Sequence, residues 1–135
     1  MKFRVGLIGN RAHQNIYGPI LKAREDTEIV AMAEHHSEKA KLLEDLYGLP
    51  CSQDYDAVFE NPDVDYVTIC TDFYLKRKLI LKAIECGKHV LVDKPLARTV
   101  REAREIVKAA DGASVKIVLS YSSRFLPERV KLARH

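Results

Sequence analysis

The chain has 135 residues, which is enough for one domain with its own core and too few for two ordinary domains. Apolar residues make up 47% and charged residues 30%, which excludes disordered and fibrous classes, and no apolar run approaches the length of a membrane span. The net charge of +3 comes from Lys and Arg dispersed among Asp and Glu, so the sequence offers no dense basic run for nucleic acid.

Cysteine usage and the N-terminus indicate a reducing compartment. Cys51, Cys70 and Cys86 form no C-x-x-C pair and no metal-ligand spacing, so we interpret them as reduced thiols and expect no metal site. The first residues enter an apolar strand directly, without the apolar stretch and cleavage site of a signal peptide. We therefore expect a cytoplasmic protein that binds neither a membrane nor nucleic acid.

Apolar strands and amphipathic helices alternate from the N-terminus onward. In chain order, the first half predicts a strand over 3–8, a helix over 15–24, a strand over 28–33, a helix from an N-cap at Ser37 to Tyr47, an extended stretch over 49–52 and a short helix over 54–60. Gly18-Pro19 either lies early in its helix or marks a break before it. Leu42, Leu43 and Leu46 supply the expected apolar face of helix 37–47.

The second half continues the alternation. It predicts a strand over 64–70, a helix ending at Gly87, a strand over 89–92, a helix from Thr99 to about Ala110, a strand over 115–120 and a helical start near Pro127. In the helix before Gly87, the run Lys76 to Lys78 is expected to stay in solvent. Thr99 and Glu102 form a capping box, and the inward face of their helix is expected to carry Val100, Ala103, Val107 and Ala110. This alternation predicts a doubly wound α/β domain with a parallel sheet covered on both faces.

Polar or conformationally special residues stand just past each predicted strand. They are Gly9, Glu34, Thr71, the pair Asp93–Lys94 and the segment 121–124. Ligands of such sheets bind beyond the carboxyl ends of the strands, so we expect these residues to converge on one binding site.

Two of these positions suit a dinucleotide. Gly9 leaves bare backbone where a pyrophosphate can approach the amides at a helix start, and Glu34 stands where a carboxylate accepts from the adenosine ribose. That carboxylate would repel a 2′-phosphate, which favours NAD over NADP, and the neighbouring His35 could soften the preference. The alternatives are an ordinary tight turn at Gly9 and a solvated charge at Glu34.

Lys94 is the ionisable residue with the clearest chemical use. Asp93 precedes it and Pro95 follows, so its backbone is held in an extended or turn conformation at the strand exit. A lysine there could hydrogen-bond a substrate hydroxyl, polarise a carbonyl or relay a proton during hydride transfer. The alternative is a surface lysine loosely paired with Asp93. The five histidines show no ligand-like spacing, and no nucleophile elbow or P-loop is present.

Several stretches occur in the order seen in the Gfo/Idh/MocA family, which includes glucose–fructose oxidoreductase and inositol dehydrogenases. They are residues 5–9, 28–31, 47–50, 61–65, 87–91, 93–97 and 124–127. The most specific part is 87–97, which resembles the family's G-K-H-V-x-x-E-K-P-L-A signature with Asp93 in place of Glu. The resemblance covers essentially the whole chain.

The resemblance implies a Rossmann NAD(P)-binding domain over 1–125 and the start of a connecting helix over 126–135. The family's substrate-binding domain, which carries an acid/base histidine and usually the oligomer interface, is expected to be absent from these residues. It also implies that Lys94 is catalytic, near the nicotinamide and a small sugar or polyol oxidised at CH–OH. We expect little turnover from these residues alone, and an apolar patch left by the missing domain leaves room for a homo-oligomer.

The sequence also departs from the family pattern. The fingerprint G-x-G-x-x-G/A continues here from Gly9 to Gln14 with Arg11 at the second glycine, where it either contacts a phosphate or blocks the site. The family's T-P-N-x-x-H survives only as Thr71, with Lys76 at the histidine position. The expected cofactor-binding residues are Gly9, Asn10, Arg11, Glu34, His35, Thr71, Asp93, Lys94 and Pro95.

Three functions remain open from the sequence. The first is the cofactor domain of an oxidoreductase, which the Asp93-Lys94-Pro95 run supports. The second is a non-catalytic dinucleotide-binding regulatory or interaction module, which the altered fingerprint supports. The third is a Rossmann domain for another nucleotide-bearing ligand such as coenzyme A.

Overall fold

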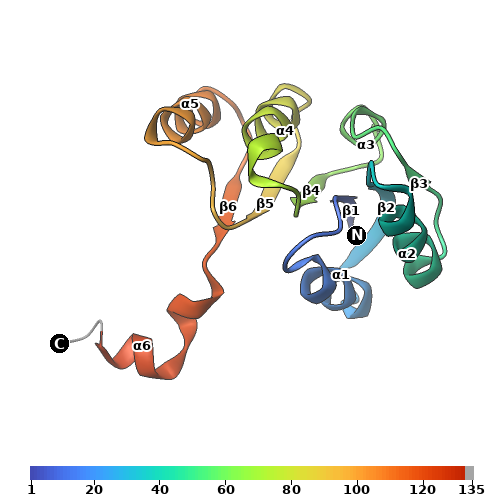
Figure 1. Ribbon diagram of the computed structural model, residues 1–135, viewed down its shortest axis with the longest axis horizontal. Coiled ribbons are helices and arrows are strands. Elements are labelled where there is room, and N and C mark those ends of the chain that lie inside the picture. The colour runs from blue at the N-terminus through green and yellow to red at the C-terminus, as the bar shows by residue number, and fades with distance from the viewer. Residues whose placement is uncertain (133–135) are drawn as a thin grey trace.

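The computed structural model describes residues 1–132 and contains one parallel sheet (Figure 1). Its strands are β1 (Phe3–Ile8), β2 (Thr27–Ala33), β3 (Cys51–Ser52), β4 (Tyr66–Ile69), β5 (His89–Asp93) and β6 (Ile117–Ser120). They lie in the order β3-β2-β1-β4-β5-β6, so the order reverses beside β1, and all neighbouring pairs are parallel. The predicted doubly wound α/β sheet is therefore confirmed, and the switch point beside β1 is where such sheets bind ligands.

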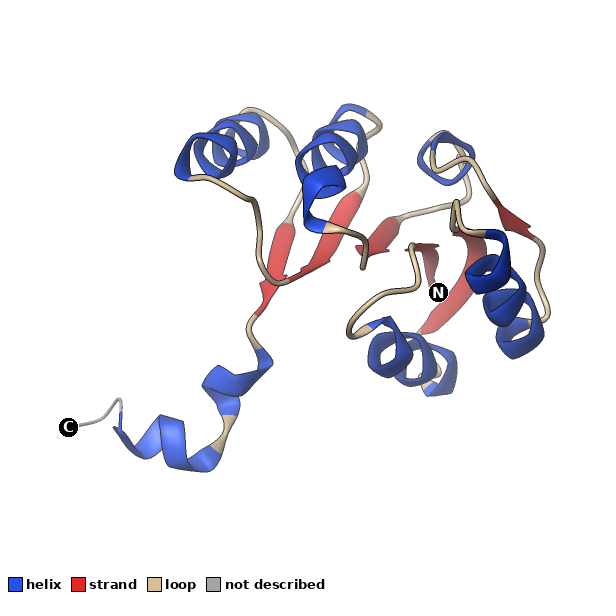
Figure 2. Ribbon diagram, in the orientation of Figure 1, coloured by secondary structure: helices blue, strands red, loops and turns tan. Residues whose placement is uncertain are grey.

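The helices connect the strands and lie on the two faces of the sheet (Figures 1 and 2). They are α1 (Gln14–Ala23), α2 (Ser37–Tyr47), α3 (Asp56–Phe59), α4 (Phe73–Glu85), α5 (Val100–Asp111), the 3₁₀ turn η1 (Ser122–Phe125) and α6 (Pro127–Leu132). Pro19 lies inside α1, so Gly18-Pro19 does not break the chain before the helix. No helix among residues 1–132 is long and apolar enough to cross a bilayer.

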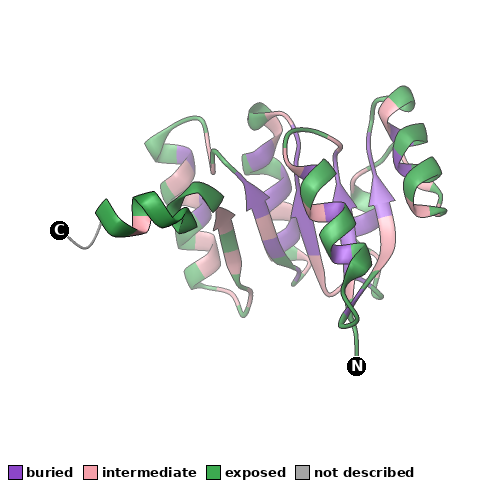
Figure 3. Ribbon diagram, turned by 90° about the horizontal axis from the view of Figure 1, so that it is seen from below, coloured by how far each residue is buried: buried purple, intermediate pink, exposed green. Residues whose placement is uncertain are grey.

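Two apolar clusters form the core, one on each face (Figure 3). The larger cluster joins β1, β4 and β5 to α3, α4 and α5, with Phe59, Ile80 and Ile106 fully or almost fully buried. The smaller one joins β1 and β2 to α1 and α2 through residues such as Leu21 and Leu43. Burial of these side chains at about 1.5–3 kcal/mol each supplies the main driving force for the fold.

Helices cover both faces of the sheet, as predicted, but they are not spread evenly along it. Helices α1 and α2 pack on β2 and β3, whereas α4 and α5 pack together on the opposite face beside β5. Among the described residues no helix covers β6 on the side of α1, and Val118 of β6 is 57% exposed. Past Ser120 the chain leaves the sheet as η1 and α6, which point away from it (Figure 1). The last part of the expected connecting helix, 133–135, lies outside the described residues.

Three predicted helix faces are also corrected. Leu42 and Leu46 are more than half exposed, and Leu43 is joined in the core by Ala40 instead. On α5, Val100 and Val107 face solvent, while Ile106 and Glu102 are buried. Only half of the capping box forms, since the Glu102 amide donates to Thr99 but the Glu102 carboxylate turns to Arg98.

Lys76 is the third correction, because it is only 2% exposed instead of lying in solvent. Its position on α4 shares the apolar face of Leu79, Ile80 and Ala83, so helical spacing directs its side chain inward. A lysine can occupy such a position only where its ammonium finds acceptors, and those acceptors lie at the carboxyl edge of the sheet.

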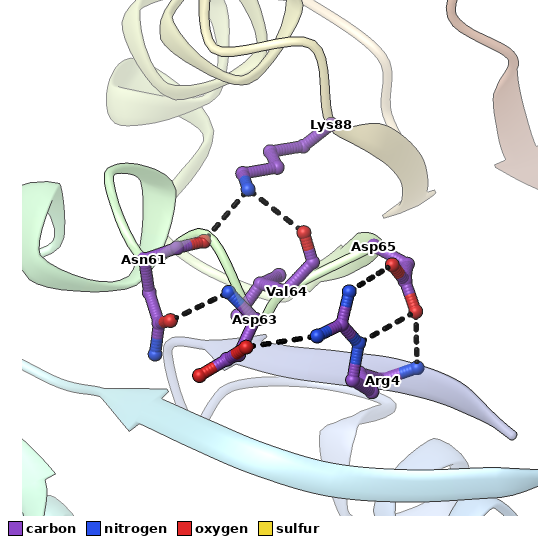
Figure 4. Close-up of polar contacts among 6 residues, drawn as sticks. All are labelled: Arg4, Asn61, Asp63, Val64, Asp65 and Lys88. Atoms are coloured by element: carbon purple, nitrogen blue, oxygen red, sulfur yellow. Dashed lines mark hydrogen bonds and ion pairs between the residues drawn. The ribbon is translucent and has the colours of Figure 1, made fainter.

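The opposite, amino edge of the sheet is closed by a separate polar cluster (Figure 4). Lys88, which precedes β5, donates to the carbonyl oxygens of Asn61 and Val64 at 2.7 and 2.8 Å. Arg4 of β1 pairs with Asp63 and Asp65, both at 2.9 Å. These contacts fix the loop before β4 and show that every charged group here has a partner within the fold.

Candidate functional site

The turn from β1 into α1 can be made only by glycine at its first position. Gly9 has φ +80°, and a Cβ atom built on it would lie 2.5 Å from the carbonyl oxygen of Cys70 and 2.6 Å from Cγ2 of Thr71. A left-handed backbone and two contacts below van der Waals distance exclude any side chain. Gly9 thus lets the β1 exit pack against the β4 exit, which brings Thr71 to the site.

Glu34 joins the ends of β1 and β2 instead of projecting into solvent. Its carboxylate is 2% exposed and accepts from the amides of Asn10 at 2.7 Å and His36 at 2.9 Å. Both carboxylate oxygens therefore already hold a backbone N–H. His35 and His36 are exposed beside it with ring centroids 3.9 Å apart, and Nδ1 of His35 lies 2.5 Å from the Tyr55 hydroxyl.

Arg11 extends across the turn at the position of the second fingerprint glycine. Its guanidinium pairs with the Asp72 carboxylate, and its backbone amide donates to the Cys70 carbonyl at 3.0 Å. The next residue, Ala12, takes the left-handed conformation with φ +47°. A non-glycine residue pays about 1–2 kcal/mol for this conformation, so the turn keeps a strained backbone at the helix start.

Two groups meet on the Asp93 carboxylate, one from the next residue and one from the start of α1. Asp93 ends β5 and is 1% exposed, and its Oδ1 atom accepts from the Lys94 amide at 2.9 Å. The same atom lies 2.8 Å from Nδ1 of His13, which directly precedes α1. Asp93 therefore fixes the backbone of Lys94, as its sequence position suggested, and also holds a histidine that no sequence motif marked.

The buried side chain of Lys76 on α4 fixes the turn formed by residues 93–95. Its ammonium donates to the carbonyl oxygens of Asp93 at 2.5 Å, Lys94 at 3.0 Å and Pro95 at 3.0 Å. All three of its N–H donors are thus accounted for by three consecutive carbonyl groups. Burial is the main reason that the pKa of Lys76 is lowered, and the nearby Lys94 adds to this effect. Lys94 itself is exposed, with its side chain free to meet a ligand.

Other groups at this edge are buried and serve packing. Burial raises the pKa of the Cys70 thiol to about 12, and the Asp93 charge adds to the shift, so Cys70 is an unreactive core thiol. Burial likewise raises the pKa of Tyr17, whose hydroxyl donates to Ser120 at 2.6 Å. This last bond ties α1 to the end of β6.

The predicted convergence of strand ends is present for most of the expected residues. Contacts link Asn10 to Glu34, Arg11 to the residue after Thr71, and His13 to Asp93. The segment 121–124 is the exception, since it leaves the sheet with η1 and no residue of it is buried.

Sequence reasoning missed two residues of this edge, His13 and Lys76. Lys76 carried a usable signal, because it falls at helical spacing among apolar residues. His13 carried none, since its partner Asp93 lies 80 residues away in the chain.

The donors at this edge suit an anionic, phosphate-bearing ligand. Gly9 removes side-chain bulk at the turn, and α1, a helix of 10 residues, directs the positive end of its dipole to the same place. Arg11 adds a guanidinium that is half exposed. The residues therefore fit the pyrophosphate of a dinucleotide, with Arg11 taking part of the space that a glycine would leave open.

Comparison with known proteins agrees with this geometry. A family model described as "Oxidoreductase family, NAD-binding Rossmann fold" (GFO_IDH_MocA) matches residues 3–121. A trans-1,2-dihydrobenzene-1,2-diol dehydrogenase from Xenopus laevis is 31% identical over 76% of this chain and 31% of that protein. A D-xylose dehydrogenase from Paenarthrobacter nicotinovorans is 33% identical over 86% of this chain and 27% of that protein.

A solved structure shares the fold over nearly the whole chain. KijD10, a 3-ketoreductase from Actinomadura kijaniata in complex with NADP and TDP-benzene, superposes with a TM-score of 0.88 at 27% identity, covering 99% of this chain and 42% of that one. This chain spans less than half the length of each of these proteins. The match over residues 3–121 nevertheless shows that the chain belongs to the Gfo/Idh/MocA oxidoreductase family and has its NAD-binding Rossmann fold.

Proposed function

We propose that this chain is the NAD(P)-binding part of an oxidoreductase that acts on the CH–OH group of a sugar or polyol. The observation that carries the proposal is the turn at the end of β5, where Asp93 and Lys76 hold Lys94 beside the start of α1. Lys94 occupies the position of the lysine in the family signature. Proteins similar to this chain include a D-xylose dehydrogenase and a 3-ketoreductase.

In this proposal Gly9, Arg11 and the start of α1 bind the pyrophosphate, while the ends of β4 and β5 receive the nicotinamide. The bound dinucleotide supplies a ring that accepts or returns a hydride. Lys94 donates a hydrogen bond to the substrate oxygen, which stabilises the charge that develops there. Asp93 and Pro95 position Lys94 within its turn, and Thr71 lines the neighbouring strand exit.

The choice between NAD and NADP is the finer part of the proposal. The sequence favoured NAD because the Glu34 carboxylate would repel a 2′-phosphate. In the structure both oxygens of Glu34 accept backbone amides, which offsets part of that repulsion, and His35 and His36 are the exposed groups beside it. We infer that the chain binds NADH and NADPH with affinities that differ by less than about tenfold, or about 1.4 kcal/mol.

Calorimetric titration with NADH, and separately with NADPH, tests the cofactor proposal. We expect saturable binding of both, weaker in Lys94→Ala and altered in Arg11→Gly, which opens the second fingerprint position. Tighter binding by Arg11→Gly would mean that Arg11 obstructs the pyrophosphate, and weaker binding that it contacts the phosphate. If folded protein binds neither cofactor, the proposal is wrong, and the altered turn favours a non-catalytic interaction module.

A further inference from the structure

We propose that His13, oriented by Asp93, takes up and returns the proton of the substrate hydroxyl. This inference rests on the proposed function, since it assigns a second residue to the same reaction centre. Nδ1 of His13 and the backbone amide of Lys94 share one acceptor atom, Oδ1 of Asp93, at 2.8 and 2.9 Å. A group near the Lys94 turn is therefore also near His13, although the two residues come from opposite sides of the switch point.

The partner of His13 fixes which ring nitrogen can react. A carboxylate only accepts hydrogen bonds, and Oδ1 of Asp93 already accepts from the Lys94 amide, so Nδ1 of His13 carries the proton in their bond. In the neutral ring Nε2 is then left with its lone pair. A buried carboxylate that holds an imidazole by Nδ1–H prepares Nε2 as a proton acceptor and stabilises the imidazolium that results.

The surroundings of His13 suit proton exchange with solvent. Its side chain is 34% exposed, whereas that of Asp93 is 2% exposed. Asp93 is therefore fixed in the interior, while His13 is accessible to solvent. The groups around the pair are Tyr17, with its ring centroid 6.0 Å away, Lys94 on the shared carboxylate and the Lys76 ammonium beneath. None of these groups covers the outer face of His13, which stays open to solvent.

Oxidation of a secondary alcohol at this site would break one C–H bond and one O–H bond. The C–H bond breaks and its electron pair leaves with the hydrogen as hydride to the nicotinamide, which is reduced. The O–H bond breaks, its electrons form the second C–O bond, and the proton passes to Nε2 of His13. The imidazolium is held by Asp93 and loses its proton to solvent, and reduction of the ketone follows the same steps in reverse.

Nitrogen NMR of the histidine rings tests the proposal, with His89 as an internal control at the other edge of the sheet. His89 accepts from the Lys116 amide through Nδ1 at 3.0 Å, so its neutral ring carries the proton on Nε2. We expect the opposite tautomer for His13. We also expect NAD⁺ and NADH at saturation to move the Nε2 resonance of His13 differently, because only NAD⁺ has a cationic ring, while His89 does not respond.

Proton release provides a second readout, measured by calorimetry in two buffers of different ionisation enthalpy. The cationic ring opposes an imidazolium nearby, so NAD⁺ should displace more proton from the wild type and from His89→Gln than from His13→Gln. An Nε2–H tautomer at His13, or equal proton release by His13→Gln and wild type, overturns the inference. Absence of any cofactor binding overturns the proposed function itself, so the two failures are distinguishable.

Discussion

Within residues 1–132, two buried lysines make similar bonds at opposite edges of one sheet. Lys88 at the amino edge is 9% exposed and donates to two carbonyl groups of the loop before β4. Lys76 at the carboxyl edge is 2% exposed and donates to three carbonyl groups of the loop after β5. Backbone carbonyl groups replace the water that each ammonium loses on burial, so both lysines fix a loop by the same interaction.

The difference lies in what each loop carries. The loop held by Lys88 carries Asp63 and Asp65, whose charges are matched by Arg4 (Figure 4). The loop held by Lys76 carries Lys94, which is exposed and of the same charge. The charges of the loop held by Lys88 are thus matched by Arg4, whereas the Lys94 side chain in the loop held by Lys76 is exposed. This difference is the one expected between a structural edge and a binding edge, and paired substitutions can test it.

The largest difference is expected between Lys76→Met and Lys88→Met. Each variant leaves buried carbonyl groups without a donor, at about 4 kcal/mol for Lys76 and about 2 kcal/mol for Lys88. Only Lys76→Met frees the turn that presents Lys94, so its NADH affinity should fall at least tenfold while that of Lys88→Met stays within twofold. Denaturant unfolding and calorimetry measure the two effects.

Lys76→Arg is the control for the case in which Lys76→Met does not fold. A guanidinium keeps the positive charge and several donors, so this variant should recover most of the stability and part of the NADH affinity. Amide hydrogen exchange locates the damage, with faster exchange over residues 93–96 expected in Lys76→Met alone. Equal loss of NADH affinity in Lys76→Met and Lys88→Met would show that the two edges do not differ in function.

One glycine at each edge allows a second comparison, in which the expected differences in stability are smaller. Gly9 and Gly87 have similar left-handed φ angles of +80° and +69°, but a Cβ atom at Gly87 would have no atom within 4 Å. Gly87→Ala should therefore cost only the conformational term, about 1 kcal/mol. Gly9→Ala adds the clash with the Cys70 carbonyl, for a total of about 3 kcal/mol, and should weaken NADH binding. Thermal unfolding with and without NADH separates these effects, and equal costs would contradict the packing argument.

Much of the fold was predictable because local patterns specify it. The periodicity of apolar residues placed every strand and every major helix within a few residues, and the helix predicted from an N-cap at Ser37 to Tyr47 begins one residue earlier, with His36 as its N-cap. Helix orientation was less predictable, since Val107 and Leu42 look apolar and inward in isolation but have no surface to pack on among the described residues. Strand ends identified Gly9, Glu34 and Lys94 as candidates, and the family resemblance implied the catalytic role of Lys94.

The contacts within the site could not be predicted in the same way. The bond between His13 and Asp93 depends on the placement of β1 and β5 on either side of β4, which no local pattern encodes. Likewise, Glu34 was expected to face a ribose, and only the three-dimensional structure shows its oxygens on two backbone amides. Partners that meet across a sheet are set by topology, so sequence reasoning finds the residues but not their pairings.

The pH dependence of stability provides the smallest test of the two edges. At the amino edge, hydrogen bonds from Arg4 lower the pKa of Asp65 below its ordinary 3.8. Asp65 therefore contributes stability above that value and loses it as pH falls through the folded-state pKa. At the carboxyl edge, burial lowers the pKa of Lys76 below its ordinary 10.5, so the native state releases this proton first. The contribution of Lys76 thus rises with pH between its folded-state pKa and 10.5.

Unfolding free energies measured across the pH range should therefore separate two variants. Asp65→Asn should lose less stability than the wild type in the acid limb and match it in the alkaline limb. Lys76→Met should match the wild type in the acid limb, because it keeps the Arg4–Asp65 pair. In the alkaline limb the raised pKa values of Cys70 and Tyr17 lower the stability of both proteins, so the expected sign of the Lys76 contribution is a difference between wild type and Lys76→Met that grows with pH. A difference that stays constant with pH would mean that this ammonium is hydrated in the native state. The three carbonyl bonds that distinguish it from a surface lysine would then not hold in solution.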